Sequence, residues 1–141
     1  LSDCRKGVNF WGTTTFIDVL DNDIKNCSNA GVNIKGQDLT VTGNVFTGCD
    51  IGFDVGVHAI TTERVTASDN DFSGCVTLGM QVSASVAEDV DASANYWGAT
   101  DGATVRATAN AGADIDYTPW LGGGTAQNGA REKDCRGPGW R

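Results

Sequence analysis

The chain has 141 residues, enough for one domain, with 18 acidic against 10 basic side chains and a formal net charge of −8 at pH 7. This charge argues against a nucleic-acid-binding protein, because phosphate contacts need clustered lysine and arginine, and no apolar run is long enough for membrane insertion. The 19 glycines, with many asparagines and aspartates, disfavour long helices, so the composition indicates an all-β domain.

Apolar residues recur along the chain in phase with a series of asparagines, which indicates an internal repeat. The asparagines are Asn22, Asn44, Asn70 and Asn95. Each stands five residues after one apolar position, three residues after a second and two residues before a third. In chain order these three columns are Ile17, Leu39, Val65 and Val90, then Val19, Val41, Ala67 and Ala92, and then Ile24, Phe46, Phe72 and Trp97.

The second half of each unit places a cysteine and then a glycine ahead of an alternating apolar pair. The cysteines are Cys4, Cys27, Cys49 and Cys75, and the glycines are Gly7, Gly31, Gly52 and Gly79. The pairs are Val8 and Phe10, Val32 and Ile34, Phe53 and Val55, and Met80 and Val82. We expect Val105 with Ala107, and Ile115 with Tyr117, to continue the series.

This pattern predicts short strands, because the apolar residues alternate with a period of two between glycine, asparagine and aspartate turns. A single unit cannot bury its apolar face, but coils stacked about 4.8 Å apart share one continuous core. We therefore predict an all-β, right-handed parallel β-helix (β-solenoid) of about five coils over residues 1–121. Residues 122–141 form a glycine-rich C-terminal tail.

The most specific motifs are Asn95-Tyr96-Trp97-Gly98 and the later segment from Asp116 to Leu121, Asp-Tyr-Thr-Pro-Trp-Leu. With the repeat, they resemble the closing segment of the right-handed parallel β-helix repeat families, which include pectate-lyase-like proteins. The resemblance spans most of the chain and implies a fold. Because this fold carries many unrelated functions, the resemblance alone assigns none.

The asparagine and cysteine columns are interpreted first as structural. Stacked asparagine amides at turns can bond to each other and to the backbone, and Cys4, Cys27, Cys49 and Cys75 are either disulfides or buried thiols. Zinc is less favoured, since there is a single histidine. Cys135 lies outside the repeat and makes the count odd, which suggests a free thiol or an intermolecular bridge. Five cysteines in a small domain favour an extracellular or cell-surface location.

Two exposed ladders should run between the inward positions: Asp18, Thr40, Thr66, Asp91 and Asp116 form one, and Asn9, Asn33, Asp54, Gln81 and Arg106 form the other. Asp91 and Asp116 would be like charges on adjacent coils, unless they share a cation such as Ca²⁺. Simple solvation of both ladders is the preferred interpretation.

The best catalytic candidates are Asp54, His58 and Arg64, with Glu63 beside them, because a carboxylate, an imidazole and a guanidinium could serve proton abstraction from an acidic sugar. The signal is sparse, so an enzyme is disfavoured. Glycan binding or polysaccharide-lyase activity, with a polysaccharide as partner, is the second hypothesis.

Our first hypothesis is a structural subunit of an extracellular filament or surface assembly, a homo-oligomer formed by end-to-end association. The chain starts at Leu1, half a coil into the repeat, as a processed product or a fragment would. Val8 and Phe10 would then form an open edge for strand addition. Cys135 of one copy could lock this contact to Cys4 of the next.

Overall fold

Ten β-strands form the described part of the chain in the computed structural model, which covers residues 2–55, 63–82, 90–98, 107–109 and 115–116. None of these residues belongs to a helix that could cross a membrane. The strands are β1 (Ser2–Leu20), β2 (Asp23–Thr42), β3 (Val45–Thr47), β4 (Ile51–Val55), β5 (Glu63–Ser68), β6 (Asp71–Gly74), β7 (Leu78–Val82), β8 (Val90–Asp91), β9 (Ala107–Ala109) and β10 (Ile115–Asp116).

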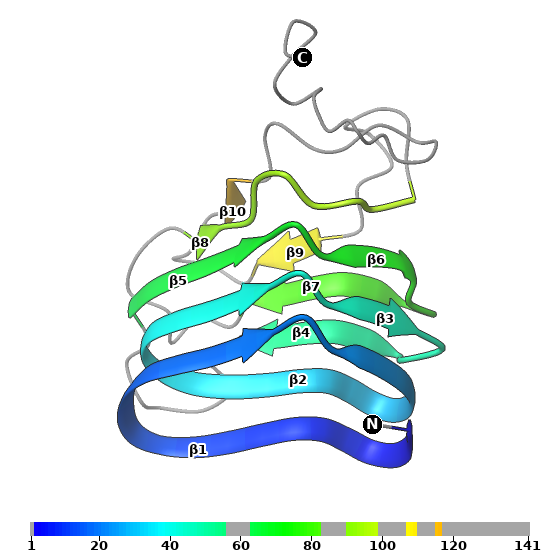
Figure 1. The fold of residues 1–141 in the computed structure, drawn as a ribbon, viewed down its shortest axis with the longest axis horizontal. Coiled ribbons are helices and arrows are strands. Elements are labelled where there is room, and N and C mark those ends of the chain that lie inside the picture. The colour runs from blue at the N-terminus through cyan, green and yellow to red at the C-terminus, as the bar shows by residue number, and fades with distance from the viewer. Residues whose placement is uncertain (1, 56–62, 83–89, 99–106, 110–114, 117–141) are drawn as a thin grey trace, which may run out of the picture.

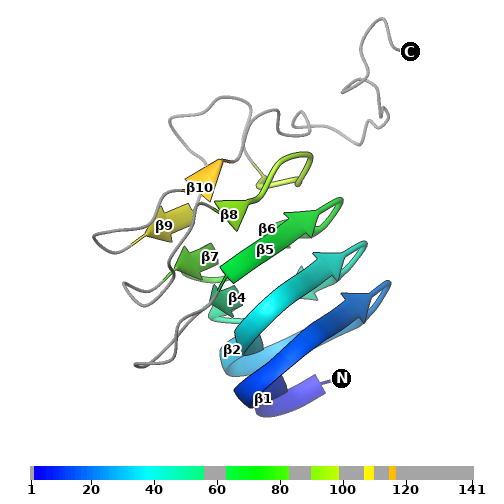
Figure 2. The ribbon, with the colours of Figure 1, turned by 90° about the vertical axis from the view of Figure 1, so that its left-hand side faces the viewer.

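All strand pairs are parallel, and each coil stacks on the one before it (Figure 1). The long strand β2 follows β1 along its length and then pairs, segment by segment, with β3, β4 and β5 of the next coil. In the next coils β3 pairs with β6, β4 pairs with β7, and β5 pairs with β8. Further on, β7 pairs with β9 and β8 pairs with β10. Figure 2 shows the coils as successive rungs, with β1 at the end of the stack. The parallel β-solenoid predicted from the repeat is confirmed.

The number of coils is smaller than predicted. The described strands make about three turns. Cys4 pairs in register with Cys27, and in the next two steps the N–H of Asp50 donates to the carbonyl of Cys27 and the N–H of Val76 to the carbonyl of Cys49. The expectation of about five coils also counted half coils and segments that lie outside the described residues.

One register was also wrong. Met80 and Val82 pair with Ala107 and Ala109, not with Val105 and Ala107. Because side chains alternate with a period of two, a shift of two residues leaves the apolar pattern unchanged. The sequence pattern could not distinguish these two registers.

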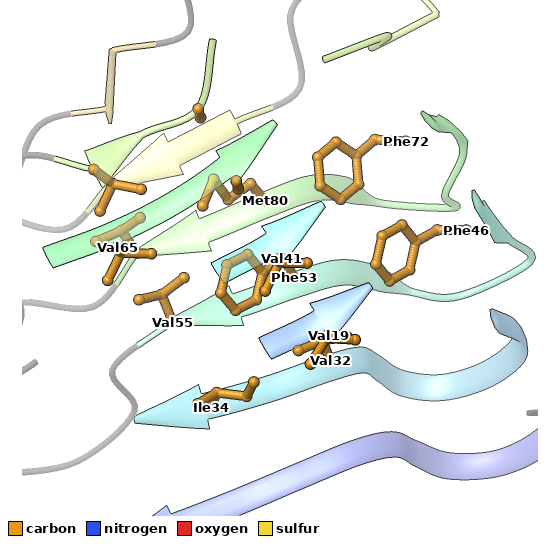
Figure 3. Packing of buried hydrophobic residues seen from close by; sticks show 14 of the residues in the cluster. Val19, Val32, Ile34, Val41, Phe46, Phe53, Val55, Val65, Phe72 and Met80 are labelled. Atoms are coloured by element: carbon orange, nitrogen blue, oxygen red, sulfur yellow. The ribbon is translucent and has the colours of Figure 1, made fainter. Parts of the chain in front are cut away.

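The predicted apolar columns fill the solenoid. The column Val19, Val41, Ala67 and Ala92 is at most 5% exposed, and the column Ile24, Phe46, Phe72 and Trp97 at most 1%. Phe72 stacks between Phe46 and Trp97, with ring centroids 5.0 and 4.9 Å away. Figure 3 shows Phe46 and Phe72 one above the other in neighbouring coils. The three rings form a continuous apolar stack along the axis.

The glycine column makes room for this aromatic stack. A Cβ atom added at Gly52 would lie 2.6 Å from Cδ1 of Phe72 and 2.6 Å from the carbonyl oxygen of Gly79. The same construction at Gly31 brings a Cβ within 2.6 Å of Cδ1 of Phe46. Any larger residue would therefore push the rings or the backbone of the next coil aside.

The asparagine column forms a hydrogen-bonded ladder, which we call the asparagine ladder (Asn22, Asn44, Asn70 and Asn95). Oδ1 of Asn70 accepts the backbone N–H of Asn44 at 2.9 Å and its amide Nδ2 at 3.0 Å. Asn22 bonds to Asn44, and Asn70 to Asn95, in the same way. The structural interpretation of this column is confirmed.

The turn before each rung places one residue in the left-handed region. Asp21, Gly43, Asp69 and Ala94 have φ angles of 53°, 72°, 56° and 57°. Aspartate and glycine tolerate this conformation best, which explains their recurrence immediately before the asparagines.

Candidate functional site

Two of the catalytic candidates lie on different segments of the solenoid. Asp54 of β4 pairs in register with Asn33 of β2. Arg64 of β5 bonds instead to Asp38, at the corner of β2 that precedes the next sheet face. His58 and the side chain of Glu63 lie outside the described residues. Asp54 and Arg64 therefore lie on different strands and bond to different partners, Asn33 and Asp38.

The second predicted ladder is a polar row that is buried at its centre and not solvated along its length: Asn9 is exposed, Gln81 is half-buried, and Thr108, not Arg106, pairs with Gln81. Asn33 is 1% exposed and Asp54 is 6% exposed. Nδ2 of Asn33 donates to Oδ2 of Asp54 at 2.9 Å, and Nε2 of Gln81 donates to Oδ1 of Asp54 at 3.4 Å. Buried carboxylates need such partners, because an unpaired charge is costly away from water.

Lys6 completes this polar row, and sequence reasoning missed it. Nζ of Lys6 donates to Oδ1 of Asn33 at 2.6 Å. Lys6 stands two residues before Val8, so the alternation alone predicts an inward side chain. The register between β1 and β2, however, shifts between Cys4 and Lys6. The row therefore links a cation to the carboxylate of Asp54 through the neutral amide of Asn33, an arrangement that stabilises buried polar groups.

Asp38 and Arg64 form a bidentate ion pair at an exposed corner. Nε of Arg64 lies 2.5 Å from Oδ1 of Asp38, and Nη2 lies 3.0 Å from Oδ2. Both residues adopt left-handed backbone conformations, with φ of 54° and 52°. The hydrogen bonds from Arg64 hold the pKa of the Asp38 carboxyl below its usual value.

We expect Arg64→Gln to raise the pKa of Asp38 towards the usual aspartate value, because the charge-assisted hydrogen bonds are lost. A carboxyl with a lowered pKa in the folded state stabilises the protein above its unfolded pKa, and this contribution is lost as the pH falls through the folded pKa. NMR titration of the Asp38 carboxyl carbon measures the shift. Lys25→Gln, which breaks the separate Lys25–Asp23 pair, should leave the titration of Asp38 unchanged.

Asp91 and Asp116 lie opposite each other in β8 and β10. The register also joins Asp18 to Thr40, Thr40 to Thr66, and Thr66 to Asp91, as the first predicted ladder required. Within the described ranges no group of three or more histidine, cysteine, aspartate or glutamate side chains could hold a metal ion. Calcium binding by the two aspartates stays a prediction.

The cysteine column consists of free thiols. Cys27, Cys49 and Cys75 are buried, and Cys4 is half-buried at the end of the stack. Sγ of Cys4 lies 3.2 Å from Sγ of Cys27, closer than van der Waals contact but not bonded. Burial raises the pKa of the Cys27 thiol above its usual range, and its hydrogen bond with Cys4 raises it further. Cys135 lies outside the described residues.

The outer edge of β1 is the remaining candidate site. Among the described strands, β1 pairs only with β2. Val8 and Ile17 are half-buried against the core, and Phe10 is 43% exposed. The equivalent residues one coil further in, Val32 and Ile34, are 0% and 1% exposed. The edge therefore presents inward-phase apolar side chains together with a 19-residue strand.

Comparison with known proteins yields one family match. The family model described as "right handed beta helix region" matches residues 1–118 of the chain. No curated protein and no solved structure matches the sequence.

Proposed function

The chain belongs to the right-handed β-helix family, and from that premise we propose that it is a structural subunit of an extracellular filament or surface assembly. In this assembly β-helix domains stack end to end, and the outer edge of β1 receives a coil of a second copy. The observation that carries the proposal is the exposure of Phe10, 43%, beside the 1% exposure of its register partner Ile34.

A coil of the same repeat is the occupant whose chemistry fits this edge. Within the solenoid, Cys27, Val32 and Ile34 of β2 pair with Cys4, Val8 and Phe10 of β1. The outer side of β1 would therefore meet an added coil with the same register positions. An added parallel strand would satisfy backbone groups along β1 and cover the apolar side chains in one step. A head-to-tail contact of this kind extends a fibre unless it closes into a ring.

The glycan hypothesis has less support. Asp54 is 6% exposed and already accepts hydrogen bonds from Asn33 and Gln81, and Arg64 is bound to Asp38. A general base must reach the proton of a bound sugar, which a buried and hydrogen-bonded carboxylate does poorly.

Sedimentation velocity over a range of protein concentrations tests the stacking. We expect the parent chain to associate with rising concentration, and negative-stain microscopy to show fibres. Phe10→Asp should weaken association by about tenfold or more, because it places an unpaired charge in an apolar contact. Val76→Asp is the matched control, since Val76 is 68% exposed and lies between β6 and β7.

Circular dichroism of both variants verifies that they keep the β-solenoid. A parent chain that sediments as a monomer at the highest concentration would overturn the stacking proposal. Equal association of Phe10→Asp and the parent would show that β1 is not the contact.

A further inference from the structure

We propose that Cys4 and Cys27 are an oxidisable pair that forms a disulfide between the first two coils when the protein meets a small-molecule disulfide. The proposal goes beyond the assembly described above and does not depend on it. It concerns a modification site whose reaction fastens β1 to β2 within one chain.

The backbone already places the two cysteines for a bond. Cys4 and Cys27 are register partners in neighbouring parallel strands, where Cα atoms lie about 4.8 Å apart, within the range that disulfides span. Their Sγ atoms are 3.2 Å apart. Only a small side-chain rotation is then needed to form the bond, without movement of either strand.

The turn ahead of the two cysteines holds this register. Asp3 and Asn26 precede Cys4 and Cys27, and both adopt a left-handed conformation with φ of 55° and 53°. Nδ2 of Asn26 donates to Oδ1 of Asp3 at 3.0 Å. Matching turns joined by a hydrogen bond therefore keep the thiols opposite each other before any oxidation.

Access to an oxidant singles out this pair within the column. Cys4 is half-buried at the end of the stack, whereas Cys27, Cys49 and Cys75 are buried. The thiol of Cys49 is directed to the carbonyl oxygen of Ile24, at 3.6 Å. Of the four cysteines in the described ranges, a reagent from solution can therefore reach Cys4 first, and the sulfur of Cys27 lies 3.2 Å from that of Cys4.

The reaction balances as two exchange steps. The Cys4 thiolate attacks one sulfur of the small disulfide, forming a mixed disulfide and releasing one small thiolate, which takes a proton. The Cys27 thiol then loses its proton, and its sulfur attacks Sγ of Cys4 and releases the second small thiol. Two cysteine S–H bonds are lost, one protein S–S bond forms, and two electrons reduce the small disulfide to two thiols.

The burial of Cys27 explains why it reacts second. Its raised pKa slows its attack on reagents in solution, so its reaction depends on the sulfur that Cys4 holds beside it. The two cysteines are 23 residues apart. Closing a loop of this length restricts the unfolded chain and should raise the melting temperature by roughly 5 to 10 °C.

The test uses the full chain in mixtures of reduced and oxidised glutathione, followed by alkylation of free thiols and tryptic mass spectrometry without reductant. Each cysteine falls in a different tryptic peptide: Cys4 in 1–5, Cys27 in 26–35, Cys49 in 36–64, Cys75 in 65–106 and Cys135 in 134–136. We expect a species joining peptides 1–5 and 26–35, lighter than their sum by two hydrogens.

Variants separate the proposed bond from other cysteine chemistry. Cys4→Ser, at the half-buried position, should abolish the linked species and the rise in melting temperature on oxidation. Cys49→Ser, the matched change in the same column, should keep both. Three results would overturn the proposal. They are a link from Cys27 to Cys49, a link from Cys4 to Cys135, and alkylation of both Cys4 and Cys27 throughout the glutathione series. Because the proposed bond joins two cysteines of one chain, a protein that sediments as a monomer without reductant should still give the linked species.

Discussion

Replacing Phe72 by alanine is expected to lower the free energy of unfolding by about 3 to 5 kcal/mol, the largest effect of any substitution considered. Phe72 is fully buried and stacks on both Phe46 and Trp97. Alanine would remove the middle ring and leave a cavity that the coils above and below cannot close, because strand hydrogen bonds fix their spacing. Urea denaturation followed by circular dichroism measures the loss.

Val45→Ala is the control for Phe72→Ala. Val45 lies next to Phe46 in β3, but its side chain points outward and is 42% exposed. Its replacement should change the free energy of unfolding by less than about 0.5 kcal/mol. If Phe72→Ala unfolds at the same urea concentration as Val45→Ala, the aromatic stack does not stabilise the solenoid.

Asn70→Ala is expected to cost about 1 to 3 kcal/mol of stability, more than an ordinary polar substitution. Asn70 is 1% exposed, donates to the carbonyl oxygen of Val41 at 2.8 Å, and joins the rungs formed by Asn44 and Asn95. Alanine would leave the backbone N–H of Asn44 and the carbonyl of Val41 buried without these partners. Thermal and urea denaturation both give the size of the loss.

Asn22→Ala is the matched control, because Asn22 is a rung of the same ladder but is exposed to solvent. Water can replace the bonds that its side chain makes, so the loss of stability should stay within about 0.5 kcal/mol. Equal melting of Asn70→Ala and the parent chain would mean that the ladder follows the fold without stabilising it.

The repeat predicted the inward columns because every coil has the same requirement. Ile24, Phe46, Phe72 and Trp97 must each cover the neighbouring coil, so their spacing is visible in the sequence. The asparagine ladder is visible for the same reason, since each amide bonds to the next. The pairing of β9 was not predicted, because Val105, Ala107 and Ala109 alternate in the same way.

The polar row was harder to predict than the core. Asn33 and Asp54 occupy outward positions, and a pattern of alternation cannot tell a solvated outward face from a buried one. Lys6 contacts Asn33 after a local shift in the register between β1 and β2, and the regular spacing of the repeat does not predict such a shift. Asp38 and Arg64 were not paired in advance, because their contact joins corner residues of two coils that follow no apolar pattern.

The asparagine ladder also gives the solenoid a polarity. The amide oxygens of Asn44, Asn70 and Asn95 each accept N–H groups from the asparagine one coil earlier, so these oxygens face the β1 end of the stack. Among the described residues no donor reaches Oδ1 of Asn22, the first rung. Two such ends brought face to face would oppose acceptor to acceptor, whereas a coil arriving in the same orientation would bring N–H groups. If the domains stack as proposed, growth at this edge would be vectorial, and the polymer would have two chemically different ends.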